Sequence, residues 1–121
     1  MKRPKPVDSI DMPLYGGVVH LYTNRAKCQK AMACWRGHPV EFTSHSVGVS
    51  DWYDDPKKGR IYVIGVFTPD AGILSHELNH IALAALERAG INAHHASGEP
   101  FCYLQQSLFY SFWPRIQKLG K

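Results

Sequence analysis

The feature that most constrains the fold is a pair of apolar segments between residues 60 and 90. The first, RIYVIGVF (60–67), is short, nearly continuously apolar and rich in β-branched residues, which is typical of a strand. The second contains ILSHELNHIAL and is long enough for a helix. Thr68 as N-cap and Pro69 in the first turn predict its start, and Gly90 predicts its end. The chain therefore passes directly from a buried strand into a largely apolar helix.

The segment before this pair predicts a further strand and helix. LYGGVVHLYT (14–23) is rich in β-branched and aromatic residues and predicts a first strand. The residues that follow place apolar side chains at i, i+3, i+4 and i+7, which is the period of an amphipathic helix. Thr23 or Asn24 is its expected N-cap, and Gly37 lies just past its expected end.

The remaining segments complete a small α+β domain. Residues 40–53 alternate enough for one or two strands, and DDPKKG (54–59) is a turn sequence. A polar connection leads to a last helix from about Glu99 to Lys118. The order of strands and helices predicts the α+β class, with a small mixed β-sheet and the helices packed on one face.

The length and charge limit the organisation of the chain. With 121 residues it forms one domain, which we expect at 14–121 after an extended basic tail at 1–13. The formal charge is +4, and the tail MKRPKP contributes to it. Prolines favour extended chain and no aromatic residue lies among these charges, so we expect a solvated tail rather than a nucleic-acid interface.

The cysteines and the apolar runs indicate a compartment. Three cysteines at irregular spacing argue against a disulfide framework and for a reducing environment, so we expect a cytoplasmic protein. No apolar run approaches the roughly 20 residues that cross a bilayer, and no apolar centre of a secretory signal lies near the start. We expect no membrane partner, and the sequence predicts no oligomeric state.

Three polar residues within the apolar helix carry the chemistry. His76 and His80 are four residues apart, so on a helix they share one face and can reach one metal ion. Glu77 lies beside the first histidine, where its carboxylate can act as a general base on a metal-bound water without being a ligand. A solvated polar face is the alternative interpretation, and it fits poorly within so apolar a run.

A catalytic zinc site also needs a third protein ligand and one open position. Glu99 is the candidate, because the chain between it and His80 is long enough to return to the histidines. Otherwise Glu99 is a first-turn glutamate favoured by the helix dipole. His94 or His95 can replace it as the ligand, donate a proton or hydrogen bond to a developing oxyanion, or lie in a loop.

SHELNH followed by GEPFCY resembles the gluzincin metallopeptidases, the thermolysin-like group whose zinc is held by the HExxH histidines and a glutamate on the next helix. The resemblance covers residues 60–113. It implies a minimal zincin-like domain with one Zn²⁺ per chain, held by His76, His80 and Glu99, with Glu77 as the general base.

The whole chain is also similar to short phage-encoded or prophage-encoded proteins that carry HE..H and GEPFAYL-like elements and are grouped as metallopeptidases. That likeness implies a location in the cytoplasm of a bacterial host. The glutamate motif departs from the gluzincin form at two positions: Gly98 replaces the usual Asn, and Tyr103 stands where an Asp normally orients a ligand histidine. A hydrogen bond from the Tyr103 phenol can take over that role.

Two functions follow as expectations. The first is a zinc peptidase acting on a peptide or protein substrate, with residues Val40 to Val49 as the edge strand that binds the substrate by β-addition. The alternative is a non-catalytic, zinc-stabilised phage-type protein that binds a host partner. Glu77 favours the enzyme, because a structural metal site has no chemical use for an acid beside its first ligand.

Overall fold

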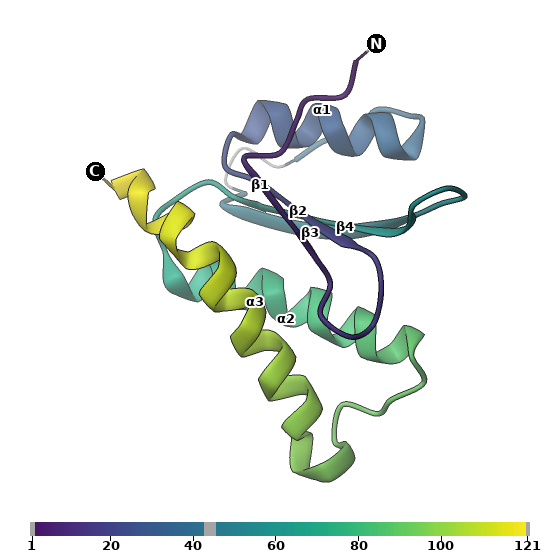
Figure 1. The fold of residues 1–121 in the computed structure, drawn as a ribbon. Helices are drawn as coiled ribbons and strands as arrows, with labels where there is room; N and C mark the ends of the chain where they lie inside the picture. The colour runs from purple at the N-terminus through teal and green to yellow at the C-terminus, as the bar shows by residue number, and fades with distance from the viewer. Residues whose placement is uncertain (1, 43–45, 121) are drawn as a thin grey trace.

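The computed structural model of the protein describes residues 2–42 and 46–120, and it confirms the predicted α+β class (Figure 1). In chain order the elements are β1 (Asp8–Asp11), β2 (Val18–Tyr22), α1 (Arg25–Arg36), β3 (Gly48–Asp55), β4 (Gly59–Val66), α2 (Ala71–Arg88), the 3-10 turn η1 (His95–Gly98), α3 (Glu99–Gln117) and the 3-10 turn η2 (Lys118–Gly120). No helix in these ranges combines the length and low polarity that a membrane span requires.

The strands form one mixed sheet in the order β1-β2-β4-β3. The two central strands, β2 and β4, run parallel, and each edge strand is antiparallel to its neighbour. A parallel pair needs a crossover connection, which the segment containing α1 and β3 supplies. In sequence, β3 comes between the two central strands β2 and β4. In the sheet, it lies at the edge and pairs with β4 alone.

Helices cover both faces of this sheet. Figure 1 shows α1 on one side and α2 with α3 on the other, so the expectation that all helices pack on one face is wrong. The reason lies in β4, whose residues Ile61–Val66 are all buried. Ile61 and Val63 pack in the α1 cluster, whereas Tyr62 and Ile64 pack in the α2 and α3 cluster. A strand that is apolar on both faces requires cover on both.

The helix boundaries follow local capping rules. Asn24 caps α1 by accepting from the Lys27 amide, and Gly37 ends it in the left-handed conformation, as predicted. The N-cap of α2 is Asp70, not the predicted Thr68: its carboxylate accepts from the first free amides of that helix. Gly90, with φ 76°, lies just past the end of α2.

The cysteines are free thiols at three levels of exposure, in agreement with the absence of a disulfide framework. Cys28 is fully buried between α1 and the sheet, and burial raises the pKa of its thiol to about 12. It is therefore a packed, neutral side chain.

The N-terminal segment is part of the domain, which corrects the expected tail at 1–13. Asp8–Asp11 form the edge strand β1, and the Val7 amide donates to the Leu21 carbonyl. Further out, the Tyr22 hydroxyl donates to the Pro4 carbonyl at 2.7 Å, and the Arg3 guanidinium lies 3.6 Å from the centre of the Trp35 ring. The sequence DSID is too short and polar to signal a strand, and pairing with β2 creates it.

Deleting residues 2–6 should lower the free energy of unfolding by about 1–2 kcal/mol, because one hydrogen bond and one cation–π contact are lost. Urea denaturation followed by tryptophan fluorescence measures the effect. The double change Lys2→Ala and Lys5→Ala keeps both contacts and should leave stability unchanged. Equal stability of the deleted and full chains would mean that the segment is a solvated tail after all.

Candidate metal centre

Helix α2 presents the three predicted residues at one place. It packs its apolar side against β4 and β3, which leaves the His76 and His80 side chains exposed. Glu77 lies on the side of α2 that faces β3, where the residue is only 7 % exposed. The ligand atoms of the three residues all lie within 4.8 Å of one another, and this is the one such group of metal-ligating side chains that the described ranges contain.

The two histidine rings have a separation suited to one metal ion. The His76 and His80 Nε2 atoms are 3.3 Å apart, with the rings edge to face. Two nitrogens bound to one tetrahedral zinc at about 2.0–2.1 Å lie about 3.3–3.4 Å apart. The same distance also allows a hydrogen bond between the rings when one nitrogen carries a proton and the other does not. The separation of the two nitrogens is therefore compatible with one shared zinc ion and also with a hydrogen bond between the rings.

Glu77 is a largely buried residue, but its carboxylate oxygens are not among the buried atoms that lack a hydrogen-bond partner, so solvent reaches them. Within the described part of the chain, no hydrogen bond or ion pair reaches it. Glu77 lines two hollows, from which water can hydrate the carboxylate. The carboxylate also lies close to the two histidine nitrogens. Its position beside the pair is therefore compatible with a cation at this place.

The backbone of β3 approaches Glu77 closely because residue 48 is a glycine. A Cβ at Gly48 would lie 2.7 Å from Ile73 Cγ2 and 2.9 Å from the Glu77 carboxylate oxygen Oε2. Real side chains do not tolerate such distances. The absence of a side chain at Gly48 thus lets α2 lie against the edge strand, with Glu77 held between them.

Two hollows flank the histidine pair along the junction of α2 and β3, each of about 450 Å³. Glu77 lines both of them. The first is lined by Ser46, Val47, Gly48, Asp70, Gly72, Ile73, His76 and Glu77, and the second by Arg36, Val49, Ser50, Asp51, Trp52, Glu77 and His80. An ion pair between Arg36 and Asp51 borders the second hollow. The polar residues of α2 therefore face an open channel beside an edge strand.

The structure does not bring Glu99 to the histidines. Helix α3 packs on the side of α2 that carries Ser75, whose hydroxyl accepts from Gln105 Nε2 at 2.9 Å. His76 and His80 lie about 100° and 140° around the helix from Ser75. Figure 1 also shows α3 beginning at a distance from α2. The predicted ligand set of two histidines and Glu99 is therefore not assembled in this structure.

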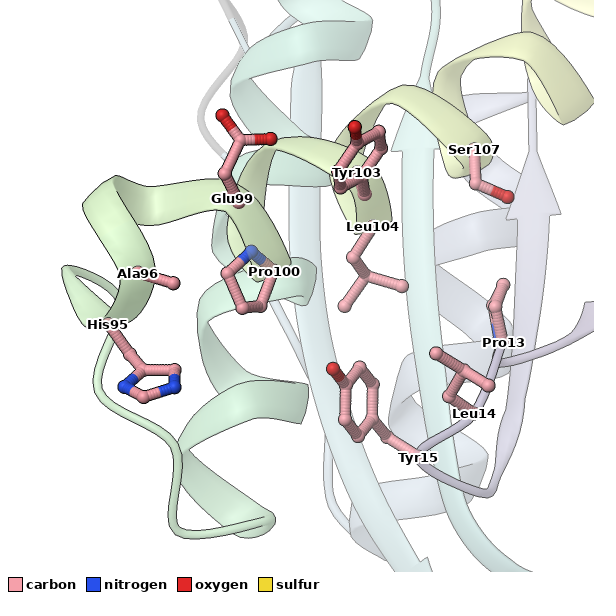
Figure 2. Close-up of a pocket in the computed structure, with 10 residues that line it drawn as sticks. All are labelled: Pro13, Leu14, Tyr15, His95, Ala96, Glu99, Pro100, Tyr103, Leu104 and Ser107. Carbon is pink, nitrogen blue, oxygen red and sulfur yellow. The ribbon is translucent and has the colours of Figure 1, made fainter.

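The other predicted residues gather with Glu99 around a different hollow. His95 and Tyr103 line this hollow with Glu99, and Figure 2 shows the Glu99 carboxylate pointing away from the His95 ring. His94 is exposed in the preceding loop. No described hydrogen bond joins Tyr103 to either histidine of the pair, so its predicted orienting role has no support in this geometry.

Sequence reasoning placed the edge strand too early and missed Gly48. The strand expected at Val40 to Val49 is β3 at Gly48–Asp55, and residues 43–45 of that prediction lie outside the described residues. The sequence does contain a signal for the observed strand, because apolar and polar residues alternate in VGVSDWY, directly before the turn. The role of Gly48 depends on a contact with α2, which no local pattern encodes.

Comparison of the chain with protein-family models, with curated proteins and with solved structures found no match. The function must therefore be inferred from the geometry of the site.

The change Gly48→Ala should lower the free energy of unfolding by about 1–3 kcal/mol, because the added methyl group overlaps Ile73 and Glu77. A matched control is Gly72→Ala in the first turn of α2, where the nearest atom is the Asp70 carboxylate oxygen at 3.1 Å. Alanine favours helix there, so the control should be neutral or stabilising. Equal denaturation midpoints for the two variants would contradict the close packing of β3 on Glu77.

Proposed function

We propose that the protein is a zinc-dependent peptidase whose metal is held by His76 and His80. The observation that carries the proposal is the 3.3 Å separation of the two Nε2 atoms, with the Glu77 carboxylate within 4.8 Å of them. Imidazole nitrogen is a preferred zinc ligand. When bound, zinc supplies a Lewis acid that lowers the pKa of water and polarises a carbonyl group.

Glu77 is the proposed general base. It is held against β3 with its carboxylate near the histidine nitrogens and without a competing donor. In this position it can take a proton from water and pass it to the amine that leaves when the peptide bond breaks. Glu77 follows the proposed ligand His76 directly in the sequence, so it lies near the metal position without being a ligand. Its carboxylate is therefore free to transfer the proton.

The outer edge of β3 is the proposed binding surface for the peptide. The Val47 carbonyl accepts from the Phe67 amide, so the alternation of an antiparallel pair directs the backbone groups of Gly48 and Ser50 away from β4. At Trp52 the outward amide already donates to the Asp51 carboxylate. An extended peptide can therefore pair with β3 beside the histidines and end near Trp52.

The third ligand stays a prediction. For Glu99 to act as the third ligand, the start of α3 would have to move toward the histidine side of α2.

The alternative function, a zinc-stabilised phage-type protein that binds a host partner, has one observation in its favour: both histidines are exposed on an open surface. The experiments below separate the two functions.

The purified protein should contain about one zinc per chain, and His76→Ala or His80→Ala should abolish it. Elemental analysis and competition with a chromophoric chelator measure the content and the affinity. The double change His94→Ala and His95→Ala is the matched control and should leave zinc binding intact. Absence of zinc from both the native and the zinc-supplemented protein would contradict every catalytic assignment.

Glu99→Ala, measured in the same way, determines the coordination. A fall in zinc affinity would establish Glu99 as a ligand and require movement of α3. Unchanged affinity would exclude Glu99 from the ligand set.

Glu77→Gln should retain zinc and the fold but reduce peptide cleavage by at least about 10²–10⁴-fold, the usual contribution of a positioned general base. The amide has nearly the shape of the carboxylate but accepts no proton. Cleavage of an unfolded protein substrate by the zinc-loaded native chain and by the variant is the measurement. If the native chain cleaves nothing across a diverse peptide library, the binding protein is the better interpretation.

A further inference from the structure

Positive charge is concentrated in two segments of the chain. Residues 2–7 contain three of the lysines and arginines (Lys2, Arg3 and Lys5), and residues 23–40 contain four (Arg25, Lys27, Lys30 and Arg36). Together the two segments hold seven of the 14 lysines and arginines and none of the 10 aspartates and glutamates. Such an excess of one sign creates a positive potential that attracts anionic partners.

The fold brings the two segments together on the face of the sheet that α1 covers. The Arg3 guanidinium lies 3.6 Å from the centre of the Trp35 ring, in the last turn of α1. Figure 1 shows the N-terminal segment beside that helix. Burial lowers the pKa of His20 in β2, and the charges of Arg3 and Lys58 lower it further. The expectation against a nucleic-acid interface rested on a solvated tail, and the packing of this segment on the domain removes that reason.

Two of the seven cationic side chains have partners within the chain. Arg25 donates to the Ser46 carbonyl, and Arg36 pairs with Asp51. The other five form no ion pair within the described residues, and four of them are exposed lysines. We call these five residues the basic α1 face: Lys2, Arg3, Lys5, Lys27 and Lys30.

A hollow of about 510 Å³ lies along the outward side of α1. Alanine side chains of the helix and Cys34 line one wall. Residues 38–40 line the other wall, and the Gln29 side chain holds them there by donating to the Val40 carbonyl at 2.6 Å. Lys30 also lines the hollow. The hollow is therefore a largely apolar recess directly beside a member of the basic α1 face.

We propose that the basic α1 face binds single-stranded nucleic acid, with phosphate groups at its lysines and a base in the hollow. Lysine ammonium groups bind phosphate oxygens, and this attraction supplies essentially all of non-specific nucleic-acid binding. A base is uncharged and flat, so it can enter an apolar recess while the phosphate next to it contacts Lys30. His38, in the far wall, offers an exposed ring on which a base can stack. Lys27 lies about one helical turn before Lys30 and receives the neighbouring phosphate.

The same features argue against duplex DNA and against a membrane as the partner. A helix of about 10–12 Å diameter already fills the major groove, which is about 12 Å wide, and residues 38–40 beside α1 add a second thickness of chain. An anionic membrane takes up large apolar side chains between the cations. The outward side of α1 presents alanine and cysteine in that place. A single strand requires neither a projecting helix nor large apolar side chains.

Binding at this face does not depend on the metal. Figure 1 shows α1 on the opposite side of the sheet from α2, which carries the histidine pair. Loss of zinc therefore leaves the basic α1 face unchanged, and absence of nucleic-acid binding leaves the metal site unchanged.

Fluorescence anisotropy of a labelled oligothymidylate with the full chain tests the proposal. We expect binding that weakens with salt, with a slope of log affinity against log salt concentration of about −0.7 for each phosphate bound. The double change Lys27→Ala and Lys30→Ala should lower the affinity at low salt by at least about 10-fold. It should also reduce the slope by about 1.4, because two phosphate contacts are lost. Alanine favours helix, so α1 stays intact in this variant.

The matched control is the double change Arg115→Ala and Lys118→Ala. It removes the same charge from exposed positions at the C-terminal end of α3, and it should leave the affinity nearly unchanged. Equal weakening by the two double variants, or no binding at low salt, would overturn the proposal. Stronger binding to a duplex, to polyglutamate or to vesicles of an anionic phospholipid would assign the face to another partner and overturn it as well.

The native cysteines report where the strand lies. Cys34 is half-buried and lines the hollow, Cys102 is exposed on α3, and Cys28 is fully buried. Adding the oligothymidylate should slow alkylation of Cys34 by iodoacetamide in proportion to the fraction of protein bound, and leave alkylation of Cys102 unchanged. Mass spectrometry of the digested protein measures both rates. Any other pattern of protection overturns the placement of a base in the hollow.

Discussion

The contact between α2 and the edge strand β3 determines the position of every catalytic group proposed here. Gly48 allows the backbone of β3 to reach the Glu77 side chain, and the burial of β4 on both faces holds α2 in place beneath it. Glu77 lies against Gly48 and lines the two hollows along the junction of α2 and β3. His76 and His80, one residue before Glu77 and three after it, each line one of the two hollows, where the proposed metal ion and peptide would bind.

The placement of His76 and His80 on one face of a helix depends only on their spacing in the sequence, and it was predicted correctly. The i, i+4 relation of His76 and His80 needs only a helix, and an apolar run of helical length directly after a strand supplies one. The α+β class follows in the same way from alternating elements. The continuous apolar run of β4 also held information about layering, because a strand buried on both faces predicts helices on both sides.

The predictions that the structure does not bear out concern features that depend on tertiary contacts. The strand β1 exists because β2 offers it hydrogen-bonding partners, not because DSID favours a strand. The distance from His80 to Glu99 along the chain permits a return to the histidines but does not require it. The outcome depends on which side of α2 packs against α3. In this structure it is the side that carries Ser75, whose hydroxyl accepts from Gln105, and not the side that carries the histidine pair.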